Sequence, residues 1–423
     1  MLELIIATFI IGYLLIALEH PLKINKSGSA IFMGVLIWSI YTIGWPESDT
    51  VSEMSHHLGA ISEILFFLVG AMTIVEIVDA HDGFNLITNR ITTRSKLRLI
   101  WIISLLAFFL SAILDNLTTA IVMVSLTRKL IERRDQRLFF AGMIVIAANA
   151  GGAWSPIGDV TTTMLWIGGQ ITTLNIIKML ILPSIVCVLV PLIYITLFQR
   201  KSMEGELPAM KKKSLDRENK VIFFLGVGGL IFVPVFKQLT HLPPYVGILF
   251  VLGFLWIISD IIHRKKNQEV KEKYSASNAL MRIDMPSLLF FLGILLAVAG
   301  LESLHVLKEV AIWMDDTIGN KDIIVLGIGL LSAIVDNVPL VAASMGMYDL
   351  SVYPADHKIW VFIAYCAGTG GSVLIIGSAA GVAAMGMEKI DFIWYLKKIS
   401  FIALLGYLSG AAVYLVQFQF MHG

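Results

Sequence analysis

The chain has 423 residues, of which 57% are hydrophobic and 15% are charged, and its mean hydropathy is +0.81. Soluble domains carry about 25% charged residues, so this composition excludes a soluble enzyme and predicts an all-α membrane protein with many spans. The net charge of +1 gives no sign of a nucleic-acid partner.

Apolar runs that are long enough, or nearly long enough, to cross a hydrocarbon core of about 30 Å recur along the chain. The first run has no basic residue ahead of it, so we expect a span and not a cleaved signal peptide. Cys187 and Cys366 lie in such runs and are expected to be buried free thiols. Ten runs are predicted to be spans: 2–18, 29–45, 60–78, 138–167, 174–198, 221–237, 244–262, 286–301, 356–387 and 391–417.

Two further apolar stretches, 99–127 and 323–347, each carry an Asp-Asn pair. The pairs are Asp115-Asn116 and Asp336-Asn337, which lie 221 residues apart in a largely repeated apolar frame. A charged residue is costly inside a membrane segment. We therefore expect each stretch to be a re-entrant hairpin whose polar tip contributes half of one site.

The distribution of Lys and Arg supports this layout. With both stretches as hairpins, 27 of the 32 Lys and Arg residues fall on one side of the membrane, Lys23 and Lys26 among them. By the positive-inside rule that side is the cytoplasm. We expect a protein of the bacterial inner (plasma) membrane with both termini outside. The outer side keeps Lys178, Lys237, Lys308, Lys321 and Lys358.

The same layout predicts an internal repeat. Residues 1–198 and 221–423 would each contain five spans and one hairpin, and residues 199–220 would be a charged cytoplasmic linker containing Lys211 to Lys213. Because five is odd, the second repeat would be inverted relative to the first. The predicted fold is therefore an inverted repeat with about ten transmembrane helices, two of them broken.

The two breaks are expected at polar, glycine-rich interruptions over residues 149–163 and 367–381. Gly151-Gly152 matches Gly370-Gly371, and Gly158-Asp159 matches Gly377-Ser378, both at an offset of 219. Glycines in membrane helices often only allow close packing. Here each interruption follows an Asp-Asn hairpin in both halves, which favours a binding site, because broken backbone in a membrane is tolerated where it lines a cavity.

The candidate ligands are hard oxygen donors, which suit a hard cation. A buried carboxylate that can hold either a proton or a cation makes the two compete. We expect Asp115, Asp159 and Asp336 to carry that competition, with sodium held at Asp115, Asn116, Asp159, Asp336 and Asn337. The full candidate set is Asp115, Asn116, Thr118, Thr119, Ser155, Asp159, Asp336, Asn337, Thr369 and Ser378.

Other ionisable residues lie near predicted span ends, where side chains that reach out to water are the ordinary explanation. Glu76 is the deepest of them and is a candidate proton relay. No Arg or Lys lies inside either hairpin core or either break, which argues against an anion site. No His/Cys cluster or nucleotide-binding motif is present, so we expect no cofactor.

The stretches SAILDNLTTA and SAIVDNVPLVA, with GGAWSPIGDVTTT between them, resemble the NhaD-type sodium/proton antiporters of the ion-transporter superfamily. The resemblance covers essentially the whole chain. It implies an inverted-repeat fold with opposed hairpins, and a homodimer with a scaffold part and a moving transport part. Related dicarboxylate carriers have Ser-Asn-Thr hairpin tips, whereas this chain has Asp115 and Asp336 there, and Pro339 replaces the first Thr of the second tip.

These observations predict a secondary transporter, not an enzyme. It would exchange sodium (or lithium) for protons by alternating access and serve pH homeostasis, with small cations and the lipid bilayer as its partners. The alternative is a sodium-coupled symporter of a small organic or inorganic anion. An intramembrane protease lacks support, since no GxSG or HExxH motif is present.

Overall fold

The computed structural model describes residues 1–91, 93–131, 133–199, 215–334 and 336–422. Within these ranges the ordered elements are helices and no strand occurs. Most of the predicted linker 199–220, including Lys211 to Lys213, lies outside the described residues. Cys187 and Cys366 are buried and free, as expected.

Helices in the first half follow the predicted runs closely. The short helices α2 and α5 cover Glu19–Leu22 and Asn85–Thr88. The longer ones are α1 (Leu2–Ala17), α3 (Lys26–Gly44), α4 (Thr50–Ala80), α6 (Lys96–Leu114), α7 (Asn116–Leu130), α8 (Arg134–Ala153), α9 (Val160–Ile167) and α10 (Thr173–Phe198).

The second half also contains short and long helices. Short helices α13 (Gln268–Tyr274), α14 (Ala276–Arg282) and α21 (Phe392–Tyr395) connect the longer ones, and a π-helical turn over Leu396–Ser400 precedes α22. The longer helices are α11 (Arg217–Thr240), α12 (Pro244–His263), α15 (Met285–Ser303), α16 (Val306–Ile318), α17 (Lys321–Leu331), α18 (Asn337–Met347), α19 (Lys358–Gly370), α20 (Ala379–Glu388) and α22 (Phe401–His422).

Eight segments of the described chain are long and apolar enough to cross a membrane: α3, α4, α6, α10, α11, α12, α15 and Phe392–Met421. The sequence predicted ten spans. The difference arises at α1, which is shorter, and at 138–167 and 356–387, each of which is divided into two helices. Helix α6, predicted as one arm of a hairpin, is by length and composition a candidate span on its own.

The polar interruptions end helices where the sequence predicted breaks. Asp115 separates α6 from α7 and has a φ of 90°, a conformation that a non-glycine residue rarely adopts. The next helix then begins on a side-chain cap, because a carboxylate or hydroxyl oxygen satisfies one of the free N–H groups of the first turn. Helices α7, α9, α18 and α20 begin in this way at Asp115, Asp159, Asp336 and Ser378.

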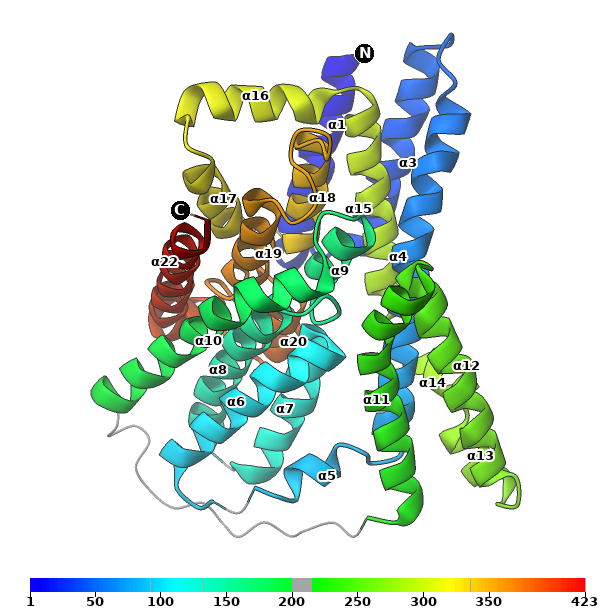
Figure 1. Cartoon of the computed structure of the whole chain (residues 1–423), viewed down its shortest axis with the longest axis vertical. Coiled ribbons are helices and arrows are strands. Elements are labelled where there is room, and N and C mark those ends of the chain that lie inside the picture. The colour runs from blue at the N-terminus through cyan, green and yellow to red at the C-terminus, as the bar shows by residue number, and fades with distance from the viewer. Residues whose placement is uncertain (92, 132, 200–214, 335, 423) are drawn as a thin grey trace.

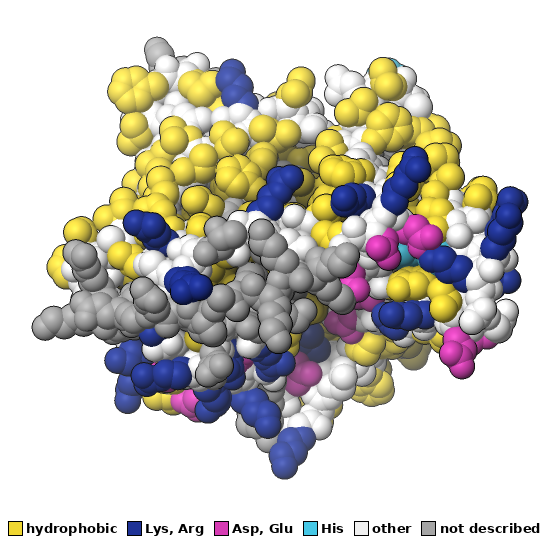
Figure 2. Space-filling view, turned by 90° about the horizontal axis from the view of Figure 1, so that it is seen from below, with side chains coloured by type: hydrophobic (Ala, Val, Ile, Leu, Met, Phe, Trp, Pro, Cys, Tyr) yellow, Lys and Arg dark blue, Asp and Glu magenta, His cyan; other side chains and the backbone are white. Residues whose placement is uncertain are grey.

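The helices pack into one bundle (Figure 1). Helix α3 lies along α15, α10 lies along α22, and α6 folds back on α7, while α16 crosses the top of the view. A methyl group at Gly34 of α3 would overlap the carbonyl oxygen of Gly293 in α15, so these two helices are held backbone to backbone. Lys and Arg side chains gather on the lower face (Figure 2).

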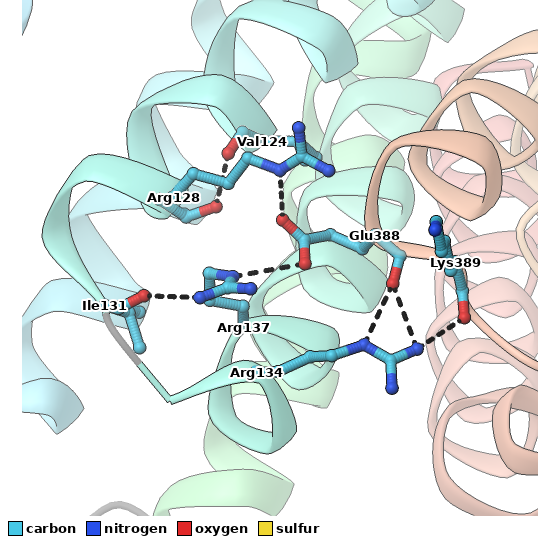
Figure 3. A network of polar contacts seen from close by, with 8 residues as sticks. Val124, Arg128, Ile131, Arg134, Arg137, Glu388 and Lys389 are labelled. Atoms are coloured by element: carbon cyan, nitrogen blue, oxygen red, sulfur yellow. Dashed lines mark hydrogen bonds and ion pairs between the residues drawn. The ribbon is translucent and has the colours of Figure 1, made fainter.

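An ion-pair network around a buried carboxylate joins the two halves of the chain (Figure 3). The Glu388 carboxylate at the end of α20 is 2% exposed and accepts from Arg128 Nε at 2.7 Å and Arg137 Nε at 3.1 Å. The Arg134 guanidinium donates to the backbone carbonyls of Glu388 and Lys389. Three arginines from α7 and α8 therefore secure the C-terminal end of α20, where cations are favourable.

Candidate ion-binding site

Two asparagines and one aspartate form the centre of the candidate site. Asn116 Nδ2, in the first turn of α7, donates to Asp159 Oδ2 at 2.7 Å and to Asn149 Oδ1 at 3.1 Å. Asn149 Nδ2, in α8, donates in turn to the hydroxyls of Ser372 and Ser378, both at 2.9 Å. All five side chains are buried. One network thus links the first hairpin tip to both helix breaks.

The other oxygen of Asp159 accepts from Thr161 N and Thr161 Oγ1, both at 2.9 Å. Asp115 similarly accepts from Thr118 N and Thr118 Oγ1, both at 2.8 Å. In the part of the chain that the structure describes, no Lys, Arg or His forms an ion pair with either carboxylate.

Asp115 and Asp159 face a common small cavity. Its volume is about 20 Å³, which is enough for one water-sized occupant. Apart from the two carboxylates and Thr163, apolar side chains from α4, α6, α9, α11 and α12 line it, together with Ile157 from the break. The arrangement offers two carboxylates in a dry enclosure, a setting that favours a single bound cation or proton.

Asp336 has a different partner. Its Oδ2 lies 3.1 Å from Nζ of Lys26, at the start of α3, and it does not line the small cavity. Asp159 nevertheless interacts electrostatically with both Asp115 and Asp336. Of the three predicted carboxylates, two therefore line the cavity and the third is paired to a lysine.

The remaining candidates divide into satisfied and unsatisfied groups. Ser155 Oγ donates to the Ala112 carbonyl at 2.5 Å, and Thr369 Oγ1 donates to the Tyr365 carbonyl at 2.6 Å. Thr119 Oγ1 and Asn337 Nδ2 are buried without a partner in the structure. A buried polar atom without a partner is costly, so the Thr119 hydroxyl remains a candidate ligand close to the first tip.

The glycines of the two breaks make matching contacts. A methyl group at Gly151 would overlap the carbonyl oxygen of Phe108, and one at Gly370 would overlap that of Gly329. Phe108 and Gly329 are 221 residues apart, like the two Asp-Asn pairs. Ser111 and Ser332, which are also 221 apart, donate to the carbonyls of Ala148 and Ala367. Each break therefore packs directly on the helix ahead of its hairpin tip.

Glu76, the candidate proton relay, lies in α4 one turn beyond Met72, which lines the cavity. Glu76 itself does not line it, and its charged neighbours are Asp79 and Arg282. The structure thus places Glu76 next to the site and does not bring it into contact with Asp115 or Asp159.

Sequence reasoning missed three residues of this arrangement as site members. Asn149 and Ser372 lie within the predicted breaks, and their polarity in an apolar run was the available signal. Lys26 was assigned to the charged cytoplasmic surface. Nothing in the sequence indicated that it pairs with Asp336, 310 residues away.

Comparisons with known proteins agree with this architecture. A sequence model of a family described as "Citrate transporter" matches residues 13–362. Sodium/proton antiporter 1 of Arabidopsis thaliana is 53% identical over 410 residues, covering 96% of this chain and 71% of that protein. Sodium/proton antiporter 2 of the same plant is 48% identical over 416 residues, covering 97% and 99%.

A bacterial relative and a solved structure extend the comparison. The Na⁺/H⁺ antiporter NhaD of Vibrio cholerae is 32% identical over 450 residues, covering 96% of this chain and 90% of that protein. The YdaH transporter of Alcanivorax borkumensis has a TM-score of 0.59 at 10% identity, covering 90% of this chain and 89% of that one, and shares its fold. The chain belongs to the family of NhaD-type sodium/proton antiporters, within the wider citrate transporter family.

Proposed function

We propose that this membrane protein exchanges sodium (or lithium) for protons, with Asp115, Asp159 and Asp336 as the carboxylates that hold either ion. The observation that carries the proposal is the cavity between Asp115 and Asp159, which is about 20 Å³ in volume and bears two carboxylates that form no ion pair with a cationic side chain among the described residues. Its relatives in a plant and in bacteria are named sodium/proton antiporters.

The caps of the short helices argue against an anionic substrate. A helix N-terminus attracts anions, and α7, α9, α18 and α20 all begin near the site. Three of these four N-termini are already capped by protein carboxylates, and the fourth by Ser378. A substrate carboxylate there would face Asp115, Asp159 or Asp336 at close range. Such like-charge contact is unfavourable in a low-dielectric site.

In the proposed organisation, residues 1–198 and 221–423 are inverted repeats joined by a cytoplasmic linker. The helix pairs α6–α7 and α17–α18 act as opposed re-entrant hairpins. Two features support this proposal: the matching break contacts at offsets of 219 and 221, and the concentration of Lys and Arg on one face (Figure 2). Both termini then face outward, and two copies assemble as a homodimer. Alternating access moves the hairpins and broken helices against the other spans.

The remaining candidate ligands have supporting roles in this proposal. Asn116, Asn337, Thr118, Thr119, Ser155, Thr369 and Ser378 supply neutral oxygen atoms or hold the acidic residues in place. Glu76 is the proposed proton relay, because it lies in α4 one turn beyond Met72, which lines the cavity.

The test uses purified protein in proteoliposomes that contain a pH-sensitive dye. Sodium and lithium are expected to drive proton movement at several pH values, and potassium much less. The symporter alternative is tested in the same vesicles with radiolabelled citrate and dicarboxylates. Sodium-dependent uptake of such an anion, without proton release, would overturn the proposal.

A further inference from the structure

The ion pair between Lys26 and Asp336 is the one place where a lysine reaches the candidate site within the described residues. Lys26 Nζ lies 3.1 Å from Asp336 Oδ2, and the two side chains are 20% and 11% exposed. The same ammonium group lies 4.4 Å from the centre of the Phe290 ring in α15. A carboxylate and an aromatic face together form a site for a monovalent cation, and here the lysine occupies it.

This pair makes the two hairpin tips chemically different. At the first tip Asp115 accepts hydrogen bonds from Thr118 and from the backbone of Leu117, whereas at the second tip Asp336 pairs with an ammonium group. The buried Tyr13 hydroxyl, which has no partner, and Asp159 are the other ionisable groups that interact with Asp336. Removing the ammonium would therefore leave a carboxylate beside polar and acidic neighbours in a low-dielectric setting, which is unfavourable.

The pair also joins α3 to α18, two helices that both pack on α15. Lys26 belongs to α3, which is fixed against α15 by the close approach at Gly34 and Gly293. Asp336 caps α18, which packs on α15 and α16 as well as on α9 and α19, the helices of the two breaks. Any movement of α18 with the broken helices relative to α3 and α15 has to separate Lys26 from Asp336.

We propose that Lys26 is a tethered cation that competes with transported sodium for Asp336 and so sets the affinity of the carrier for sodium. This inference rests on the proposed sodium/proton exchange. With sodium absent, Lys26 neutralises Asp336. When sodium enters, it displaces the ammonium group, so the carboxylate is never left without a cation. If Lys26 holds Asp336 for about nine-tenths of the time, sodium binds about tenfold more weakly than it would to the free carboxylate.

Two substitutions at Lys26 have opposite expected effects. Lys26→Gln removes the competing charge and is expected to lower the sodium KM by about tenfold. Its maximal rate falls, because the empty carrier then holds an uncompensated carboxylate. Lys26→Arg keeps the charge and offers a bidentate contact to the carboxylate, so it is expected to raise the sodium KM. Lys23→Gln, an exposed change three residues away, serves as the matched control and leaves KM unchanged.

The measurement combines initial rates in proteoliposomes with ²²Na⁺ binding to the full-length protein in detergent, which needs no turnover. The double variant Lys26→Gln/Asp336→Asn tests whether Lys26 acts on sodium binding through Asp336. If it does, the effect of Lys26→Gln on sodium binding should disappear when Asp336 is already neutral. This double variant replaces the ion pair with two neutral amides and keeps the test available if Lys26→Gln alone does not fold.

The outcomes separate the two proposals. If the wild type moves no protons when sodium is added, the proposed function fails. If the wild type is active but sodium affinity is unchanged or weaker in Lys26→Gln, Lys26 has only a structural role and the inference is overturned. An unchanged or lower KM in Lys26→Arg, or an equal effect of Lys26→Gln with and without Asp336, overturns it as well.

Discussion

Asp159 accepts hydrogen bonds on both carboxylate oxygens, from Asn116 on one and Thr161 on the other. The same side chain caps α9, so it stabilises the helix and also supplies a carboxylate to the candidate site. Asn and Asp are about equally good helix caps, and replacing one with the other separates these two roles. The geometry therefore allows the charge of Asp159 to be removed with little loss of folding.

Asp159→Asn is expected to abolish sodium-driven proton movement while the protein still purifies as folded. A contact between a cation and a buried carboxylate is worth about 3 kcal/mol, which corresponds to roughly 100-fold weaker binding. Initial rates in proteoliposomes measure the effect. Asp391→Asn is the control, because Asp391 is an exposed cap of α21 and should tolerate the change. Wild-type rates for Asp159→Asn would exclude this residue from the ion site.

His81, directly after α4, is buried and stacks near His263 and Tyr274. Burial lowers the pKa of His81 to about 4, whereas an unfolded histidine titrates near 6.5. As the pH falls from about 6.5 towards 4, the unfolded state binds a proton that the folded state does not, so stability is lost on acidification.

The expected outcome is a thermal midpoint in detergent that falls between pH 7.5 and pH 5, with a smaller fall in His81→Gln. His56→Gln, a change at an exposed histidine, should keep the wild-type slope. An identical slope in wild type and His81→Gln would show that His81 does not contribute to the pH dependence.

At the scale of elements, the helix breaks depend on glycine because backbone meets backbone there. Gly370 of α19 approaches Gly329 of α17 so closely that a methyl group cannot fit. Gly370→Ala is expected to cost about 1–3 kcal/mol from overpacking, seen as a lower thermal midpoint and slower exchange. Gly386→Ala in α20 is the matched control, since a methyl group there would meet no neighbouring atom within 4 Å. Equal midpoints for the two variants would contradict the close-packed break.

The positions of most helices and of the helix breaks could be predicted from the sequence. Long apolar runs predict where the helices lie, and the polar and glycine-rich stretches predict that helices are interrupted at Asp115, Asp159 and Ser378. Both signals are local in the sequence. The contacts between elements could not be predicted in this way. From the sequence, Lys26 is a surface charge, because its partner is 310 residues away. Asn149 is one polar residue of a break, because its three hydrogen bonds form only where α7, α8 and the second break meet.

At the scale of the molecule, the Glu388 network ties α20 of the second half to α7 and α8 of the first (Figure 3). Glu388→Gln leaves Arg128 and Arg137 without their buried carboxylate, and breaking a buried pair in this way costs about 3–5 kcal/mol. We expect a lower thermal midpoint with an unchanged sodium KM, because the network does not touch the cavity. Arg133 pairs with Asp135 at the surface, so Asp135→Asn should change little. A changed KM with an unchanged midpoint would contradict a purely structural network.

Competition between a proton and sodium for the same carboxylates is the central claim, and the pH dependence of the sodium KM in proteoliposomes tests it most directly. Competition predicts that KM rises as the pH falls, approaching about tenfold per pH unit once the competing carboxylate is mostly protonated, while the maximal rate at saturating sodium stays nearly constant. A sodium KM that does not change with pH, together with a maximal rate that does, would contradict the account.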